Sequence, residues 1–234
     1  MYPYLEEGVE KLKRRLIKMG SLVEEQIKNT VTALFEGNTE LAEMVIAQDE
    51  KVDKYEVKID KQCQKIIALT QPVAFDLRLI LSAISINRDL ERMGDSAVNI
   101  AKLVDRIKEH KDFLFDIELN KMSEQTLLNV KNSLDSFING DYKLAFEVIR
   151  ADEIVDRFDD ELVRVVIDKM LNDKNLIVAG THVINVIRNL ERLSDHATNI
   201  AEEIIFLIDS KIVKHKKDIS ESEVINDSPE DIRE

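Results

Sequence analysis

A fourteen-residue stretch of this 234-residue chain occurs twice, and this repetition constrains the fold more than any other feature of the sequence. The copies are RDLERMGDSAVNIA at 88–101 and RNLERLSDHATNIA at 188–201, with nine identical positions and a constant offset of 100. A second pair of segments, EGNTELAEMVIAQDEKVD at 36–53 and NGDYKLAFEVIRADEIVD at 139–156, repeats at an offset of 103. Similarity over such distances predicts two structurally equivalent halves.

Apolar residues in and around the repeated stretch follow one another at spacings of four and three. This heptad pattern continues for several turns, which a β-strand cannot produce. The pattern therefore predicts a long amphipathic helix as the third helix of each half. The two apolar seams are Leu79, Ala83, Ile86, Leu90, Met93, Ala97, Ile100, Val104 and Ile107, and Ala179, Val183, Val186, Leu190, Leu193, Ala197, Ile200, Ile204 and Leu207.

The break between the first and second helix of each half carries a glycine followed by a capping residue. Gly37 and Gly140 suit the left-handed conformation that ends a helix, and Asn38 and Asp141 are expected to cap the helix that follows. Breaks as short as these place consecutive helices side by side and antiparallel.

The chain is predicted to be all-α, with two tandem antiparallel three-helix bundles related by an internal repeat. The first helices are expected over roughly residues 5–36 and 118–138. Beyond residue 213 the apolar period is lost, so a solvated tail is expected. The predicted domains are residues 1–110, 111–213 and the polar tail 214–234.

Composition excludes several classes of partner. The net charge is −13 and no basic stripe is present, which argues against nucleic acid and against adsorption to anionic lipid. No apolar run is long enough to enter and cross a bilayer, and the N-terminus lacks the apolar region of a signal peptide. Cys63 is the single cysteine, which is typical of a reducing compartment, so we expect a cytoplasmic protein.

Pairs of acidic residues four positions apart recur on the predicted second and third helices of both halves. Residues at this spacing share one face of a helix, and on the third helices this face lies away from the apolar seam. The second and third helices of each half are separated by a second break, QPVAFD in the first half and LNDKN in the second. If this break is a hairpin corner, the acidic pairs on both helices lie about 30 Å from it, at 1.5 Å per residue. We therefore expect the pairs to lie level. They are Asp49 and Asp53, Glu91 and Asp95, Asp152 and Asp156, and Glu191 and Asp195.

Four carboxylates at one level repel one another unless positive charge neutralises them. Arg88 and Arg92, with Arg188 and Arg192 in the second half, lie close enough to the acids for ordinary ion pairs on a helix surface. Alternatively, the carboxylates bind divalent or trivalent metal ions such as Mn, Fe, Mg, Ca or Zn. The spacing leaves both arrangements open.

The sequence lacks the usual signatures of an enzyme. The six glycines are isolated, so no glycine-rich phosphate loop exists, and Glu-x-x-His, which di-iron carboxylate bundles use, does not occur. The four histidines form no recognisable catalytic constellation. We therefore expect a non-enzymatic protein. The alternatives are a carboxylate-bridged metalloenzyme or metal-storage bundle, and a purely structural helical scaffold.

The doubled motif DLERMGD…NIA and NLERLSDHATNIA resembles the PhoU family, and QPVAFDLRLILSAI before the first copy looks like that family's approach to its third helix. The similarity spans roughly residues 5–212. The resemblance implies a cytoplasmic regulator of inorganic phosphate uptake that represses the phosphate-starvation response. It also implies contact with the ATPase subunit of the phosphate transporter and with a membrane phosphate-sensing histidine kinase.

The resemblance further implies metal ions, iron or zinc above all and in multinuclear clusters, on acid-x-x-x-Asp motifs. Ser96 departs from the family's usual histidine after the motif aspartate, whereas His196 keeps it, so the first site is expected to be weaker or differently ligated. The positions that carry over are Asp49, Asp53, Glu91, Asp95, Asp152, Asp156, Glu191 and Asp195.

A homodimer is expected because long amphipathic helices often leave a second apolar stripe. The residues that lie off the main seams are Val98, Leu103, Ile205 and Ile208.

Overall fold

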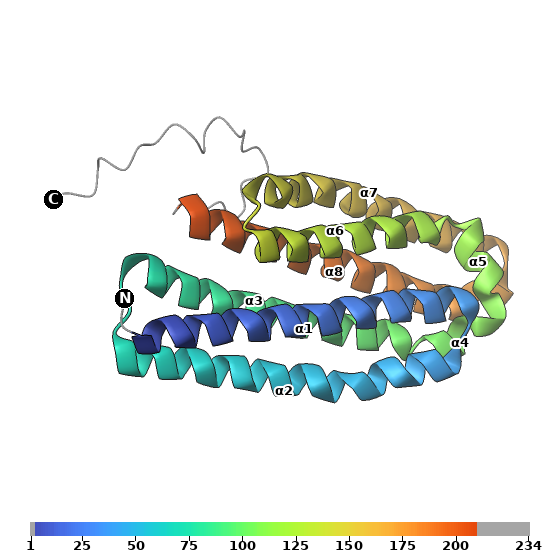
Figure 1. Cartoon of the computed structure of the whole chain (residues 1–234). Helices are drawn as coiled ribbons and strands as arrows, with labels where there is room; N and C mark the ends of the chain where they lie inside the picture. The colour runs from blue at the N-terminus through green and yellow to red at the C-terminus, as the bar shows by residue number, and fades with distance from the viewer. Residues whose placement is uncertain (1–2, 210–234) are drawn as a thin grey trace.

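The computed structural model describes residues 3–209, and all regular secondary structure in this part of the chain is helical (Figure 1). The predicted tail 214–234 lies outside the described residues. The elements are α1 (Pro3–Glu36), α2 (Thr39–Thr70), α3 (Ala74–Ala101), α4 (Val104–Ile107), the 3-10 turn η1 (Lys108–His110), α5 (Lys111–Asp116), α6 (Leu119–Asn139), α7 (Tyr142–Asn172), the 3-10 turn η2 (Lys174–Leu176) and α8 (Ile177–Asp209).

The all-α prediction with two tandem bundles is confirmed. Helices α1, α2 and α3 form the first bundle, and α6, α7 and α8 form the second (Figure 1). The short elements α4, η1 and α5 connect the two, and the predicted boundary after residue 110 falls inside this connection.

The breaks between the helices form as the sequence predicts. Gly37 and Gly140 have φ angles of 69° and 64°, in the left-handed region that a residue without Cβ adopts at little cost. The side chains of Asn38 and Asp141 accept hydrogen bonds from backbone N–H groups in the first turns of α2 and α7. These caps fix where α2 and α7 begin, and so fix the height of the acidic residues that the two helices carry.

Both predicted apolar seams are buried along their whole length. The first seam does not lie on one uninterrupted helix, however, because α3 ends at Ala101 and its last two residues, Val104 and Ile107, belong to α4. The heptad pattern reports which side of the chain faces the core. It does not require the helix to be continuous, and a four-residue helix in the same orientation preserves the pattern.

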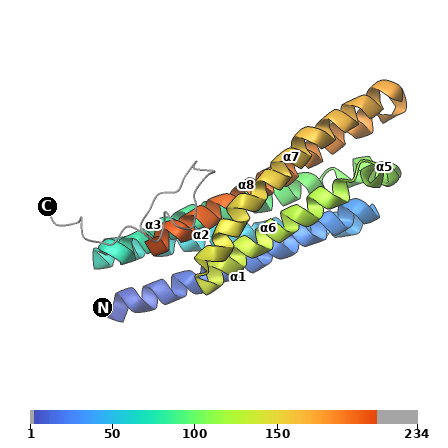
Figure 2. The ribbon, with the colours of Figure 1, turned by 90° about the horizontal axis from the view of Figure 1, so that it is seen from above.

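The two bundles pack against each other through α3 and α8, which run side by side in opposite directions (Figures 1 and 2). Val98 and Ile205 are almost completely buried, and Leu103 is half-buried against the core. The apolar stripe that suggested a dimer is therefore largely covered within one chain, so it does not supply a surface for a second copy. The side chain of Ile208, the fourth member of the stripe, lies outside the described residues.

Within residues 3–209, no helix combines the length and the apolar character that crossing a membrane requires.

Candidate metal centre

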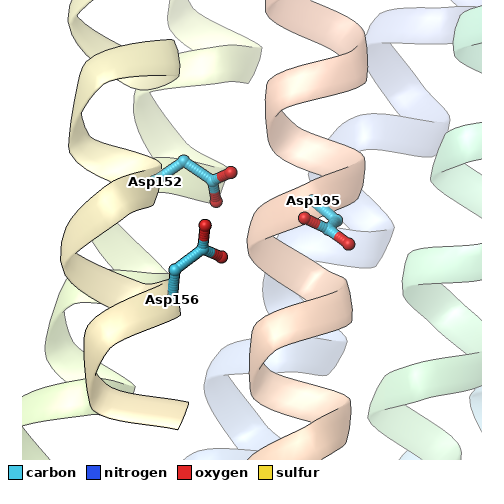
Figure 3. A group of neighbouring side chains, drawn as sticks. All are labelled: Asp152, Asp156 and Asp195. Carbon is cyan, nitrogen blue, oxygen red and sulfur yellow. The ribbon is translucent and has the colours of Figure 1, made fainter. Parts of the chain in front are cut away.

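Three carboxylates of the second half lie together between α7 and α8 (Figure 3). Asp152 and Asp156 point from α7 toward α8, which carries Asp195. One oxygen from each residue lies within 4.8 Å of the others. Because metal–oxygen distances are about 2.0–2.6 Å, one ion can reach oxygens roughly 4–5 Å apart. We call Asp152, Asp156 and Asp195 the aspartate trio, and its geometry suits a cation that bridges two helices.

The three aspartates of the trio differ in their exposure to solvent. Asp152 is buried with 8% of its surface exposed, Asp156 is half-buried, and Asp195 is exposed. A carboxylate at the depth of Asp152 needs hydrogen bonds or a cation to remain ionised. An ion at this position would therefore have protein on one side and open coordination positions on the other.

Asp152 is positioned by a chain of hydrogen bonds that crosses three helices. The amide of Asn129, on α6, donates to the hydroxyl oxygen of Ser194, on α8, at 2.9 Å. The Ser194 hydroxyl in turn donates to Oδ1 of Asp152 at 2.7 Å. Asn129 and Ser194 are fully buried. This chain orients the carboxylate before any ligand arrives, as supporting residues do in metal sites.

Glu191 adds a fourth acidic group to the same region. Burial raises the pKa of Glu191 from 4.5 to about 7, and repulsion from Asp195, Asp159 and Asp156 adds to the effect. The shift places the side chain among the other acids. Because a pKa near 7 leaves the group partly protonated at neutral pH, a cation that binds here must displace protons.

The first half gathers its acids in the same way. Burial raises the pKa of Asp49, and repulsion from Asp53 and Asp95 adds to the effect, while a hydrogen bond from Gln26 and the charge of Lys102 oppose it. Burial likewise raises the pKa of Glu91, followed by repulsion from Asp95, Glu56 and Asp53. The carboxylates of the first half therefore lie near one another. Within the described part of the chain, no three of them meet the distance that the trio meets.

Two substitutions between the halves alter the surroundings of the buried aspartate. Where Ser194 stands in the second half, the first has Gly94, and a Cβ there would lie 3.4 Å from both Oδ1 of Asp49 and Oε1 of Gln26. Gln26 is one methylene longer than its counterpart Asn129 and approaches Asp49 directly, at 3.4 Å. The first half thus combines glutamine with glycine at this place, whereas the second half combines asparagine with serine.

A third difference changes the charge of the two clusters. Lys102 stands at the position that Glu202 occupies in the second half, at the offset of 100 that relates the third helices. The ammonium group of Lys102 acts on Asp49 and partly opposes the rise of its pKa. Glu202 instead lines a cleft beside the aspartate trio. The first cluster thus has a lysine where the second has a further carboxylate.

His196 connects the second cluster to the first bundle. Its Nδ1 lies 3.0 Å from Oδ1 of Asp89, a largely buried residue of α3, and the Asn199 amide donates to the same oxygen at 3.2 Å. A histidine held through Nδ1 by a carboxylate keeps Nε2 for another ligand. His196 is nevertheless outside the set of side chains whose ligand atoms lie within 4.8 Å of one another.

Sequence reasoning missed the acidic residue that continues each second-helix pair. Burial raises the pKa of Glu56 and of Asp159, and each interacts with the predicted acids around it. The signal was present, because both follow the predicted pair after three residues, at the same offset of 103. Asp159 is also bonded to Arg188, one of the arginines predicted to neutralise these acids.

The chain matches the PhoU domain twice, over residues 16–104 and 119–204. A PhoU homologue of Aquifex aeolicus, named a phosphate-specific transport system accessory protein, is 41% identical over 208 residues, 89% of this chain and 94% of that protein. A homologue of Pseudomonas putida with the same name is 36% identical, over 88% of this chain and 81% of that protein. The relatives are named as accessory proteins and not as enzymes, in agreement with the prediction of a non-enzymatic chain.

Two crystal structures share the fold. PhoU from Pseudomonas aeruginosa superposes with a TM-score of 0.84 at 33% identity, over 88% of this chain and 99% of that one. The phosphate transport system regulatory protein PhoU from Streptococcus pneumoniae gives a TM-score of 0.81 at 29% identity, over 89% of this chain and 99% of that one. The paired domains, the fold and the relatives agree, and the chain belongs to the PhoU family.

Proposed function

We propose that this protein is a cytoplasmic, non-enzymatic regulator of inorganic phosphate uptake, a metal-binding adaptor between the ATPase subunit of the phosphate transporter and a membrane phosphate-sensing histidine kinase. In this role it represses the phosphate-starvation response. Relatives named as accessory or regulatory proteins of phosphate transport support the regulatory part. The observation that carries the metal part is the convergence of Asp152, Asp156 and Asp195 within 4.8 Å.

The chemistry of the donors restricts the metal. The trio offers only carboxylate oxygens, which suit hard or borderline cations and not soft ones. Iron and zinc are the ions that the family likeness favours, and Mn, Mg and Ca share the preference for oxygen. Glu191 lies beside the trio, so a second ion could share these carboxylates in a multinuclear cluster. The corresponding acids of the first half, Asp49, Asp53, Glu91 and Asp95, form the second proposed site.

A bound cation changes what this surface can contact. The chain carries a net charge of −13, and its acidic clusters repel acidic surfaces on partner proteins. A bound cation reduces that repulsion and offers open coordination positions to oxygen ligands on a partner. Metal occupancy therefore provides a way to control docking without a change of fold.

Metal content of substituted proteins tests the site. Asp156→Asn removes one charge from the trio and replaces a carboxylate ligand with a neutral, weaker amide oxygen, and Glu153→Gln removes one charge from an exposed position on the same helix. We expect elemental analysis of protein purified without added metal to show less metal per chain for Asp156→Asn and no change for Glu153→Gln. Equal losses would mean that net charge, and not the trio, retains the metal. If the wild-type chain binds no metal even when metal is added, ion pairs between the arginines and the carboxylates would be the remaining explanation of the acidic clusters.

Partner binding requires a separate experiment. The protein should be used to retain the transporter ATPase and the sensor kinase from detergent extracts, at high and low phosphate, with and without metal. We expect retention of both, and weaker retention by the metal-depleted protein. If neither partner is retained under any condition, the adaptor role is wrong for this chain, even if the metal site is real.

The expected homodimer remains a prediction, although the packing of α3 on α8 covers most of the apolar stripe that suggested it. Sedimentation equilibrium decides the question directly. A dimer that persists at low concentration would require a different surface from the one between the two bundles.

A further inference from the structure

A cleft of about 530 Å³ opens beside the aspartate trio, and residues of both bundles line it. Arg92 comes from α3 of the first bundle, and the remaining lining residues come from α7 and α8 of the second. The lining consists of Arg92, Ile149, Asp152, Asp156, Arg192, Asp195, His196, Thr198, Asn199 and Glu202. The first bundle therefore contributes a positive charge to a cavity built mainly by the second.

The charges of the cleft depend on whether a cation is present. Four carboxylates and two guanidinium groups line it, so its balance is negative without a metal ion. One divalent ion on the trio cancels that excess, and a trivalent ion or a second divalent ion makes the cleft positive. Because guanidinium groups recognise oxyanions through paired hydrogen bonds, a loaded cleft favours an anion.

Asp89 of the first bundle holds two polar side chains in the wall of the cleft. His196 and Asn199 both bond to Asp89, which holds them in place as described above. The Thr198 hydroxyl oxygen is inaccessible to solvent and has no hydrogen-bond partner among the residues that the structure describes. The wall thus contains a hydroxyl group that no described side chain engages, beside the fixed imidazole of His196 and the fixed amide of Asn199.

The matched positions of the first half lack these features. Ser96, Val98 and Lys102 stand where the second half has His196, Thr198 and Glu202. Val98 is a buried apolar side chain in place of a hydroxyl group, and Lys102 places an ammonium group near the acids. The histidine, the hydroxyl group and the fourth carboxylate of the cleft are thus specific to the second half.

We propose that the cleft binds a tetrahedral oxyanion of the phosphate type, which Arg92 and Arg192 hold while it completes the coordination of a cation on the aspartate trio. A tetrahedral anion offers oxygens in several directions and can meet two guanidinium groups and a metal at once, whereas the two oxygens of a carboxylate lie in one plane. This inference rests on the metal site of the proposed function. It adds a ligand, and it gives Arg92 a role in joining the two bundles.

Equilibrium dialysis of the full chain with labelled inorganic phosphate, with and without Mn²⁺, tests this inference. We expect phosphate to bind only when Mn²⁺ is present. We also expect phosphate to raise the affinity for Mn²⁺ by the same factor by which Mn²⁺ raises the affinity for phosphate, because coupling between two ligands is reciprocal.

The matched variants are Arg92→Gln and Arg88→Gln. Both residues are exposed arginines of α3, one turn apart, but only Arg92 lines the cleft. Loss of a charged hydrogen-bonding group predicts phosphate binding about ten- to hundredfold weaker for Arg92→Gln. Arg88→Gln should match the wild type in phosphate binding, and both variants should keep their Mn²⁺ binding.

The outcomes separate this inference from the function on which it rests. Mn²⁺ binding without phosphate binding, phosphate binding that ignores Mn²⁺, or equal effects of Arg92→Gln and Arg88→Gln would each overturn the oxyanion site and leave the metal site intact. A wild-type chain that binds no Mn²⁺ and no phosphate would overturn both. The same dialysis with a phosphate monoester distinguishes two sources of the oxyanion. Binding of inorganic phosphate alone would identify the free ion as the ligand, whereas binding of both compounds would show that the cleft recognises a phosphoryl group.

Discussion

Replacing Ser194 with alanine tests how the buried aspartate is held. The Ser194 hydroxyl is fully buried, accepts a hydrogen bond from Asn129 and donates one to Asp152. Alanine leaves the Asn129 donor unpaired and takes one hydrogen bond from Asp152. A buried polar group that loses its partner costs about 1–3 kcal/mol. We therefore expect Ser194→Ala to lower the free energy of unfolding by about 2 kcal/mol, and the Tm by about 4–8 °C.

Ser82 provides a matched control on α3. It is also fully buried, but its hydroxyl oxygen has no hydrogen-bond partner among the described residues. Ser82→Ala removes the same atom without breaking a bond, so the free energy of unfolding should change by no more than about 0.5 kcal/mol. Urea unfolding of metal-free protein, followed by far-UV circular dichroism, compares the two. Equal effects at Ser194 and Ser82 would refute the hydrogen-bond chain as the cause.

The same pair of variants reports on the metal. Residues that orient a ligand typically change metal affinity by about 10- to 100-fold when they are removed. Ser194→Ala should therefore bind Mn²⁺ more weakly by a factor in that range, and Ser82→Ala should bind it like the wild type. An unchanged affinity for Ser194→Ala would mean that the orientation of Asp152 does not limit binding.

Four further predictions concern charge and packing. Because the folded-state pKa of Glu191, about 7, lies above its ordinary value of 4.5, the stability this group contributes is complete below pH 4.5 and is lost as the pH rises through 7. At about pH 8, Glu191→Gln should thus raise the free energy of unfolding of metal-free protein by about 1 kcal/mol, a value reduced for solvent screening. Urea titration measures this change, and a free energy of unfolding with the same pH dependence in variant and wild type would contradict it. Lys102→Glu should increase the Mn²⁺ bound per chain, measured by equilibrium dialysis, because it replaces a positive charge near Asp49 with a carboxylate. Unchanged binding would show that Lys102 does not limit that site. Gly180→Ala places a Cβ 2.5 Å from Sδ of Met170 and should lower the Tm, with a cost of about 1–3 kcal/mol that better helix propensity offsets only in part. Gly94→Ala meets only ordinary contacts of 3.4–3.5 Å and should change stability by about 1 kcal/mol or less.

The helices and their breaks could be predicted because local rules determine them. Period, glycine in the left-handed region and a capping side chain are visible in the sequence, and Gly37, Asn38, Gly140 and Asp141 adopt the predicted roles. The packing of one bundle on the other was not visible. An apolar stripe on a helix shows that something covers it, and the stripe through Val98 and Ile205 does not show that the cover is the other half of the same chain.

The candidate site was only partly predictable for a similar reason. Spacing on one helix identified all three members of the trio, because residues four apart share a face. The residues that support the trio are neutral or lie on other helices. Asn129 and Ser194 act through contacts across helices, and Arg92 reaches the cleft from the other bundle. Such contacts depend on how helices are arranged in three dimensions, which the spacing along one helix does not contain.

The packing of α3 against α8 has a consequence for how the two repeats can change over time. In a dimer of identical single repeats, every substitution appears at both sites, so neither copy could specialise alone. Joining the repeats in one polypeptide removes that restriction, because each position can mutate independently of its counterpart. Lys102 and Glu202, or Gly94 and Ser194, illustrate such differences: the first half carries a lysine and a glycine where the second carries a glutamate and a serine. Within one polypeptide, two equivalent halves can therefore differ in charge and in the support of their acidic residues.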